Sequence, residues 1–316
     1  MGPMELSLMI EGQEGVTWPD WLALAQACEA HGIPTLFRSD HYMNLDLQHP
    51  ERGSLDAWAT INALAAVTRR LRLGTMVSPA SFRHPSELAK VVVTADHVSG
   101  GRINLGIGAG WHEREHAAFG FPFAGTRTRF DVLEEQLAII HGAWGPDPFS
   151  FDGAHYTLSE LAAMPKPVQT PHPPLIIGGA AKPRSLALAA RYATEYNNLY
   201  ALPEQATERR GKLAAACEAA GRDPIRFSVM TVIVSGRDDG EVRDRARALA
   251  EKMGQDTEQL LSQPPSGWII GTTEQAIEKL DALRDAGVDR IVCQQFVHDD
   301  LDHVALIGDV LSPPVA

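Results

Sequence analysis

Cysteine and long apolar runs are scarce in this sequence. The three cysteines, Cys28, Cys217 and Cys293, are too few and too scattered for a disulfide framework or a thiolate metal site, so we expect buried thiols in a reducing cytoplasm. No uninterrupted apolar run approaches the roughly 18 residues that span a bilayer, and the N-terminus has no basic segment followed by an apolar one. These absences predict a cytoplasmic protein that is neither secreted nor membrane-spanning.

Positive charge is scarce as well. The 316 residues include 28 Lys and Arg against 40 Asp and Glu, a formal net charge of −12, so the average surface repels phosphate backbones and anionic membranes. We therefore expect a small-molecule partner and neither nucleic acid nor membrane, although a local basic patch can still bind one small anion. The composition, 44% hydrophobic and 22% charged with 27 Gly and 21 Pro, excludes disorder, collagen and a coiled coil.

What is present is an alternation of strand and helix patterns. Short apolar runs predict strands, and apolar residues three and four positions apart predict helices. The predicted strands are residues 6–10, 33–37, 71–77, 102–108, 174–177, 195–199, 226–234 and 290–294. The predicted helices are residues 18–30, 55–67, 86–98, 129–144, 183–192, 203–220, 240–253, 273–286 and 302–311. This order predicts an α/β fold, a closed (β/α)8 TIM barrel, with an open doubly wound sheet as the alternative.

The alternation breaks over residues 111–173, where a single predicted helix lies among Gly, Pro and aromatic residues. We interpret this stretch as an insertion, or lid, within one TIM-barrel domain that occupies residues 1–316. Phe119, Phe121 and Phe123 belong to it. They either cover a pocket or simply pack the insertion against the barrel.

In a TIM barrel the active site lies at the carboxyl ends of the strands. The residues that this rule selects are 38–41, 76–79, 106–111, 178–181, 196–198, 234–235 and 294–296. Among them, Asp40 and His41 follow the second strand, where a carboxylate and an imidazole can position a ligand or move a proton. Strand ends are also rich in turn residues for purely structural reasons, which is the alternative interpretation of these segments.

The fourth predicted strand ends in glycines. Residues 106–111 read Gly-Ile-Gly-Ala-Gly-Trp and resemble the dinucleotide-binding fingerprint. Trp111 stands in place of its third glycine, however, and no acidic residue ends a strand about 20 positions further on. We therefore predict that Gly108, Ala109 and Gly110 form a wall that a flat cofactor can approach closely, and not a Rossmann site.

A second glycine-rich strand end precedes a predicted helix. Gly178, Gly179 and Ala180 come just before Pro183, where that helix begins. Backbone N–H groups beside the positive end of a helix suit a phosphate, although a plain tight turn has the same sequence. Arg184 either adds positive charge at this point or is an exposed surface arginine.

Residues 112–116 read His-Glu-Arg-Glu-His, a literal match to the His-Glu-x-x-His motif of zinc proteases. On a helix, His112 and His116 would share a face with Glu113 as the general base. The segment directly follows a glycine-rich strand end, lacks the third histidine of the extended motif and is highly charged. A zinc hydrolase is therefore the remote alternative; we expect no metal and a charged helix start.

Several of these segments together resemble the luciferase-like monooxygenase superfamily, and more narrowly its F420-dependent oxidoreductase branch. The similarity extends over about residues 6–297. Its motifs are Ser39-Asp40-His41 and residues 71–79, 82–85, 99–102, 105–111, 113–116, 165–169 and 173–179. The resemblance implies a bacterial-luciferase-like TIM barrel with an insertion, which binds a deazaflavin or a flavin at the carboxyl ends of its strands.

The resemblance also implies roles for particular residues. A non-prolyl cis peptide bond between Met76 and Val77 would lie behind the central ring of the cofactor, and Asp40 would help to fix that ring. His41 would face the substrate. The loop of Gly178, Gly179 and Ala180 would hold the phosphate. Relatives carry a segment similar to residues 111–116 in which no metal is bound.

One departure from the family concerns the proton donor. Sugar-phosphate dehydrogenases of this family have a glutamate where this chain has Trp111, so that role is not carried over. We expect Trp111 and His112 to contact the substrate and His41 to be the catalytic residue. The predicted activity is hydride transfer between coenzyme F420 and a small organic substrate. A two-component monooxygenase that uses reduced FMN is the alternative, and a homodimer is expected because family members are often dimers.

Overall fold

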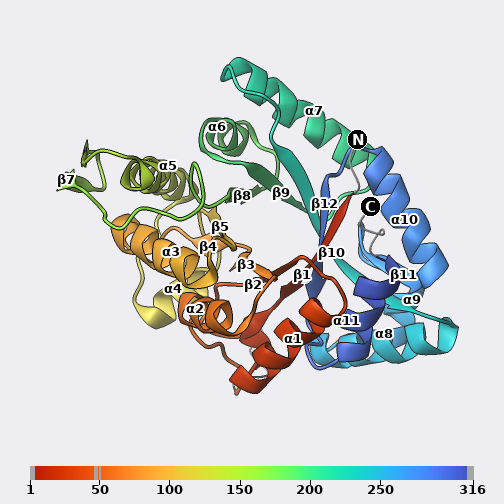
Figure 1. Ribbon diagram of the computed structural model, residues 1–316. Coiled ribbons are helices and arrows are strands. Elements are labelled where there is room, and N and C mark those ends of the chain that lie inside the picture. The colour runs from red at the N-terminus through yellow and green to blue at the C-terminus, as the bar shows by residue number, and fades with distance from the viewer. Residues whose placement is uncertain (1–3, 46–48, 50, 312–316) are drawn as a thin grey trace.

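Eight parallel strands close into a barrel, as predicted. The computed structural model describes residues 4–45, 49 and 51–311. The barrel strands are β1 (Glu5–Ile10), β2 (Thr35–Arg38), β3 (Arg72–Thr75), β5 (Ile103–Gly108), β8 (Leu175–Gly179), β9 (Glu195–Leu199), β10 (Arg226–Gly236) and β12 (Arg290–Gln295). The ring is closed because β12 pairs in parallel with both β1 and β10, and β10 pairs with β9 (Figure 1). All eight lie within a few residues of the predicted ranges.

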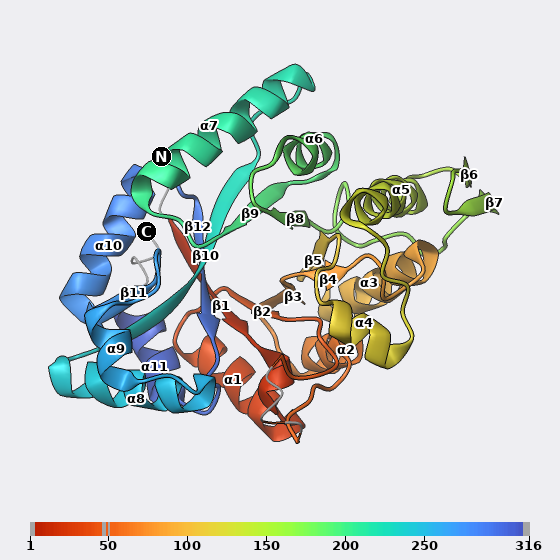
Figure 2. The ribbon, with the colours of Figure 1, turned by 180° about the vertical axis from the view of Figure 1, so that it is seen from behind.

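Helices surround this ring (Figure 2). They are α1 (Trp18–Ala30), α2 (Ala57–Val67), α3 (Pro85–Ser99), α5 (Thr126–Trp144), α6 (Pro183–Tyr192), α7 (Pro203–Ala219), α8 (Asp239–Met253), α10 (Thr273–Asp285) and α11 (Leu301–Leu306), the last continued by a π-helical turn, Ile307–Leu311. Their ends follow from local chemistry. Asp20 accepts hydrogen bonds from the hydroxyl and backbone N–H of Thr17 at the start of α1, and Gly100 ends α3 with a φ of +66°.

The apolar core has two parts, which the alternation of side chains along each strand separates. One side of the strands packs against the surrounding helices, for example through Leu8 and Leu36. The other side fills the interior of the barrel. The residues of this inner cluster are Met9, Phe37, Met76, Ile176 and Val292, each from a different part of the ring. The barrel interior is therefore packed up to the level at which the strands end.

Several short elements were not predicted. They are a 3-10 turn (Gly12–Glu14), β4 (Ser78–Pro79), α4 (Glu113–Phe119), the hairpin of β6 (Phe149–Asp152) and β7 (Thr157–Leu161), α9 (Thr257–Ser262) and β11 (Ile269–Thr272). The hairpin lies outside the ring beside α5 (Figure 1), and β11 extends the sheet along the end of β10. These elements are too short, or too exposed on both faces, to give a clear periodic pattern.

The stretch between residues 111 and 173 contains one helix that belongs to the barrel. Helix α5 packs against both α3 and α6, so it takes the place of the helix that follows β5 in the ring. That this stretch acts as a lid stays a prediction. Within the described part of the chain, no helix is both long enough and apolar enough to cross a membrane.

Candidate active site

A cavity of about 740 Å³ lies at the carboxyl ends of the barrel strands. Its size is within the usual range for small-molecule sites, and its lining is mostly apolar. The predicted site residues in its wall are Asp40, His41, Met76, Val77, Gly108, Ala109, Gly110, Trp111, Gly178, Gly179 and Ala180. Of the predicted set, only His112 does not line it. The strand-end rule therefore brought together residues that lie up to 140 positions apart in the sequence.

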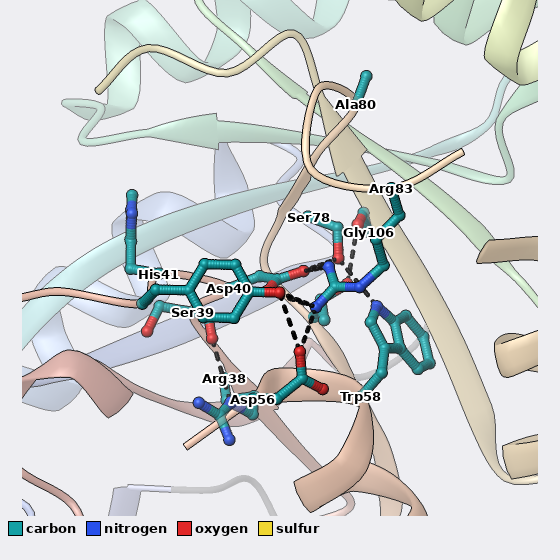
Figure 3. A network of polar contacts seen from close by, with 12 residues as sticks. Arg38, Ser39, Asp40, His41, Asp56, Trp58, Ser78, Ala80, Arg83 and Gly106 are labelled. Atoms are coloured by element: carbon teal, nitrogen blue, oxygen red, sulfur yellow. Dashed lines mark hydrogen bonds and ion pairs between the residues drawn. The ribbon is translucent and has the colours of Figure 1, made fainter. Parts of the chain in front are cut away.

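Asp40 is held by a buried ion pair at one side of this cavity. Its carboxylate accepts hydrogen bonds from Arg83, at 2.5 and 3.2 Å, and from the Ser78 hydroxyl at 2.6 Å. The guanidinium of Arg83 also contacts Asp56 at 2.7 Å and the hydroxyl of Tyr42 at 3.1 Å (Figure 3). Asp40 is 1% exposed and Arg83 8%. The carboxylate thus joins the end of β2 to the loop after β4.

This arrangement keeps the guanidinium of Arg83 charged. Burial alone would lower the pKa of Arg83, but Asp40, together with Tyr42 and Asp56, reverses this effect and raises the pKa above its ordinary value. Removal of one partner would leave the other charge buried without compensation. We conclude that Asp40 positions the segment that carries His41. Its predicted contact with a cofactor ring stays a prediction.

The bond between Met76 and Val77 is cis, as the resemblance implies, and it interrupts the predicted strand 71–77 between β3 and β4. The side chain of Val77 packs over glycines of two neighbouring strands. A Cβ atom at Gly108 would lie 3.0 Å from Val77 Cγ2, and one at Gly178 would lie 3.4 Å from Cγ1. Both glycines therefore make room for Val77. The sequence interpretation, in which Gly108 lets a flat ligand approach and Gly178 belongs to a phosphate loop or a tight turn, did not include this contact.

His41 and Glu115 form the second buried pair of the site. Nδ1 of His41 lies 2.7 Å from Oε2 of Glu115, whose other oxygen accepts hydrogen bonds from the backbone N–H groups of Tyr42 and Met43. Nε2 of His41 has no hydrogen-bond partner among the residues that the structure describes. The imidazole is thus oriented from behind by Glu115, and Nε2 is left for a ligand in the cavity.

The pKa values of this pair move apart. Burial alone would lower the pKa of His41, but its hydrogen bond to Glu115 and the negative charge of Glu115 outweigh burial and raise the pKa above 6.5. Burial alone would raise the pKa of Glu115, but His41 and the two backbone N–H groups lower it below 4.5. The pair therefore favours the protonated form of His41 and the ionised form of Glu115.

The His-Glu-x-x-His segment has a structural use that differs from a zinc site. In His116, Nδ1 lies 2.7 Å from the carbonyl oxygen of His112 and Nε2 lies 2.6 Å from the hydroxyl of Ser81, so both ring nitrogens have partners. Glu113 is exposed, whereas Glu115 is buried against His41. The described residues contain no group of three His, Cys, Asp or Glu side chains arranged to hold a metal ion.

Trp111 and His112 both lie beside His41. The Trp111 ring is 5.8 Å from the His41 ring between centroids and is 61% exposed at the edge of the cavity. The His112 ring is 6.1 Å from that of His41, and burial lowers its pKa. Because His112 does not line the cavity, it supports the ring of His41 in this structure, and its predicted contact with substrate would need a rearrangement.

The aromatic residues of the 111–173 stretch pack against the barrel loops. Phe121 stacks on Phe82 with the ring centroids 4.8 Å apart, and Phe119 contacts Tyr42 at 5.1 Å. Phe123 lies 4.8 Å from His116. None of the three is among the described residues of the cavity wall. Their positions therefore agree with the second interpretation from the sequence, in which these aromatic residues pack the insertion against the barrel.

The glycine loop at the end of β8 is held by hydrogen bonds with side chains of the neighbouring strand β9. The amide of Asn198 donates a hydrogen bond to the carbonyl oxygen of Gly179 at 2.6 Å, and the hydroxyl of Tyr196 accepts one from the backbone N–H of Ala181 at 2.8 Å. Ala180 is exposed at the tip. The loop is thus fixed in front of helix α6, whose N-terminus is a favourable place for an anion.

The positive charge near this loop comes from residues that the sequence analysis did not select. Arg184 is engaged in ion pairs with Asp131 at 2.5 Å and Glu134 at 3.3 Å, so it is not the free cation that was considered. Arg129 and Arg209 line the cavity instead. Nε of Arg129 is buried and has no partner within the described residues.

The first strand also contributes to the site. Glu11, Tyr200 and Gln294 line the cavity, and only Gln294 was within a segment selected from the sequence. Glu11 directly follows the apolar run of β1, so the rule that selected the other strand ends applies to it equally.

Glu115 was missed by the sequence analysis for another reason. It lies on a helix, and nothing in its local sequence shows that it faces His41.

A TIM barrel with a large cavity at its strand ends, lined by a paired imidazole and by arginines, is the architecture of a barrel enzyme. The sequence matches the luciferase-like monooxygenase family over residues 4–290, and the chain belongs to this family. An uncharacterized protein of Mycobacterium tuberculosis is 33% identical over 185 residues, or 54% of this chain, and the chain spans 64% of the length of that relative.

Relatives with named activities fall into two cofactor classes. The F420-dependent hydroxymycolic acid dehydrogenase of M. tuberculosis is 30% identical over 85% of this chain and 72% of its own length. The FMNH2-dependent dimethylsulfone monooxygenase of Pseudomonas putida is 29% identical over 75% of this chain and 72% of its own. Among solved structures, an F420-dependent secondary alcohol dehydrogenase has the same fold, with a TM-score of 0.80, 20% identity and 98% of each chain covered.

Proposed function

We propose that this protein is an F420-dependent oxidoreductase that transfers a hydride between the deazaflavin and the carbonyl or alcohol carbon of a small organic substrate. The observation that carries the proposal is the His41–Glu115 pair, in which Nδ1 of a cavity-lining imidazole lies 2.7 Å from the carboxylate and Nε2 has no partner among the described residues. Reduction of a carbonyl requires a proton at its oxygen, and a positioned imidazole with a raised pKa is suited to supply it.

The residues of the cavity fit a flat ring that carries a phosphate. Met76 and Val77 offer an apolar surface for one face of the ring, beside Gly108, Ala109 and Gly110. The loop of Gly178, Gly179 and Ala180, the start of α6 and the positive charge of Arg129 in the cavity wall suit the phosphate. When bound, F420 supplies or accepts the hydride.

In this scheme the protein performs the proton chemistry. Nε2 of His41 donates its proton to the carbonyl oxygen as the substrate carbon receives the hydride, and it takes the proton back when the alcohol is oxidised. Glu115 stabilises the imidazolium form and fixes the ring orientation. Trp111, at the edge of the cavity, restricts the access of water and contacts the substrate.

The need for oxygen in product formation distinguishes the proposed oxidoreductase from a monooxygenase. We expect purified protein to reduce at least one member of a panel of aldehydes and ketones in the absence of oxygen, with one reduced F420 consumed for each alcohol formed. Product analysis by mass spectrometry and the absorbance of F420 give this ratio. Oxygenated products that form only with reduced FMN and oxygen, with no anaerobic carbonyl reduction, would contradict the proposal.

A further inference from the structure

A chain of hydrogen bonds ends at the carboxylate of Glu11. The side chain of Gln13 donates to Oε2 of Glu11 at 2.7 Å, and the side chain of Gln294 donates to Oε1. Gln13 in turn accepts a hydrogen bond from Ser39 at 2.6 Å, and Gln294 accepts one from the hydroxyl of Tyr200 at 2.7 Å. Residues from the ends of β1, β2 and β12 and from the loop after β9 thus meet at one carboxylate.

The direction of every hydrogen bond in this chain is fixed by chemistry. An ionised carboxylate only accepts hydrogen bonds, so the amide nitrogen of each glutamine faces Glu11 and each amide oxygen faces away from it. Ser39 accepts the backbone N–H of Gly12 at 2.9 Å and uses its own proton on Gln13. Burial and the charge of Glu11 raise the pKa of Tyr200 to about 12, so this hydroxyl keeps its proton and donates it to Gln294. All donors therefore point toward Glu11.

The charge of Glu11 is not neutralised by a lysine or an arginine. The side chain is 6% exposed and lines the cavity, and no Lys or Arg in the described part of the chain forms an ion pair with it. Asp40, on the same wall, is by contrast paired with Arg83. A carboxylate has about four acceptor positions, and two of those of Glu11 are used by the glutamines. Acceptor capacity therefore remains beside the cavity.

We propose that Glu11 selects the substrate: it favours neutral or cationic molecules that bring a hydroxyl or ammonium donor to the carboxylate, and it excludes carboxylates and phosphate esters. The inference rests on the proposed function in that it takes this cavity to be the substrate site. Glutamines that are already oriented hold the charge in place, so a donor from the substrate finds a fixed acceptor. An anion would instead meet an uncompensated like charge in a buried wall.

Three probes with one carbon skeleton test this selection: cyclohexylmethanol, cyclohexylmethylamine and cyclohexanecarboxylate. Their dissociation constants are measured by calorimetry on protein loaded with whichever cofactor, F420 or FMN, it binds. We expect the amine and the alcohol to bind at least about 10-fold more tightly than the carboxylate, as a hydrogen bond to a charged group implies. The variant Glu11→Gln is expected to reduce this ratio by about the same factor.

Two further variants serve as controls. Glu14→Gln changes the same charge three residues away, on a carboxylate that pairs with Arg52 at 3.1 Å and does not line the cavity, so the ratio should stay as in the wild type. Glu11→Asp keeps the charge and should keep the preference for the amine and the alcohol over the carboxylate. This result would show that the effect of Glu11→Gln comes from the lost charge and not from a general disturbance of the site. A ratio that is unchanged in Glu11→Gln would overturn the proposal. If neither cofactor binds, the proposed function fails, and the same probes on the unloaded protein still test Glu11.

Discussion

Replacement of Arg83 with methionine is expected to lower the free energy of unfolding by about 3–5 kcal/mol, the usual cost of removing one partner of a buried ion pair. In the Arg83→Met variant the carboxylate of Asp40 would keep only the Ser78 hydroxyl as a partner while it stays 1% exposed. Asp56 and Tyr42 would lose their shared partner as well. The loss is large because the desolvation of the remaining charge is no longer offset.

Urea denaturation followed by circular dichroism measures this loss. Arg184→Met is the matched control, because Arg184 forms two ion pairs with Asp131 and Glu134 at sites that are more than a third exposed. Its loss should be about 0–1 kcal/mol. In the background of Arg83→Met, the change Asp40→Asn should recover part of the stability, since it removes the unpaired charge. Equal losses in the two arginine variants would contradict a buried, interdependent pair at Asp40.

Replacement of His41 with asparagine is expected to lower kcat for carbonyl reduction by about 10²- to 10⁴-fold, the usual contribution of a general acid. Cofactor affinity should change little, because the apolar surface, the glycine loop and the arginines that are proposed to hold the cofactor come from other strands and helices. Single-turnover kinetics and a fluorescence titration of the cofactor separate these two effects. A His41→Asn variant that keeps most of its kcat would remove His41 from the chemistry.

The pH profile tests the part played by Glu115. Reduction requires protonated His41, so kcat should fall as the pH rises through the raised pKa of His41. Glu115→Gln can still accept the backbone N–H groups of Tyr42 and Met43 but has no negative charge, so the fall should occur at lower pH. The stability that the raised pKa of His41 contributes follows the same sign: it is present below pH 6.5 and is lost as the pH rises through the folded-state pKa of His41. The stability that the lowered pKa of Glu115 contributes is present above pH 4.5 and is lost as the pH falls through the folded-state pKa of Glu115. Glu113→Gln, on an exposed neighbour, should leave the profile unchanged.

The fold could be predicted from the sequence because a barrel repeats one simple unit. Most of the predicted strands are short apolar runs, and each is followed by a helix or a loop, with recognisable end signals such as Gly100. The predicted strand 71–77 was less accurate, because β3 ends at Thr75, just before the cis bond between Met76 and Val77, and β4 begins only at Ser78. The hairpin of β6 and β7 has side chains that are only partly buried on one face, so it gives too weak a pattern to be found.

Only the site residues that lie at strand ends could be predicted from the sequence. Asp40, His41 and the glycines follow strands, so topology alone brings them to one cavity. Their partners could not be found in this way. Arg83 and Glu115 reach the site from a loop and a helix, and their pairing with Asp40 and His41 depends on three-dimensional packing over 43 and 74 positions. The His-Glu-x-x-His motif shows the same limit. Its sequence matches a zinc site, but in the structure both ring nitrogens of His116 already have hydrogen-bond partners, which the sequence does not show.

The most direct test of the proposed function is a titration of the purified, cofactor-free protein with oxidised F420 and, separately, with FMN. Both are followed by fluorescence quenching, and each is repeated in the presence of the other to detect competition for one site. The account predicts saturable binding of F420 at one site per chain, with FMN binding more weakly and displaced by F420. Tight binding of FMN with no binding of F420 would contradict it.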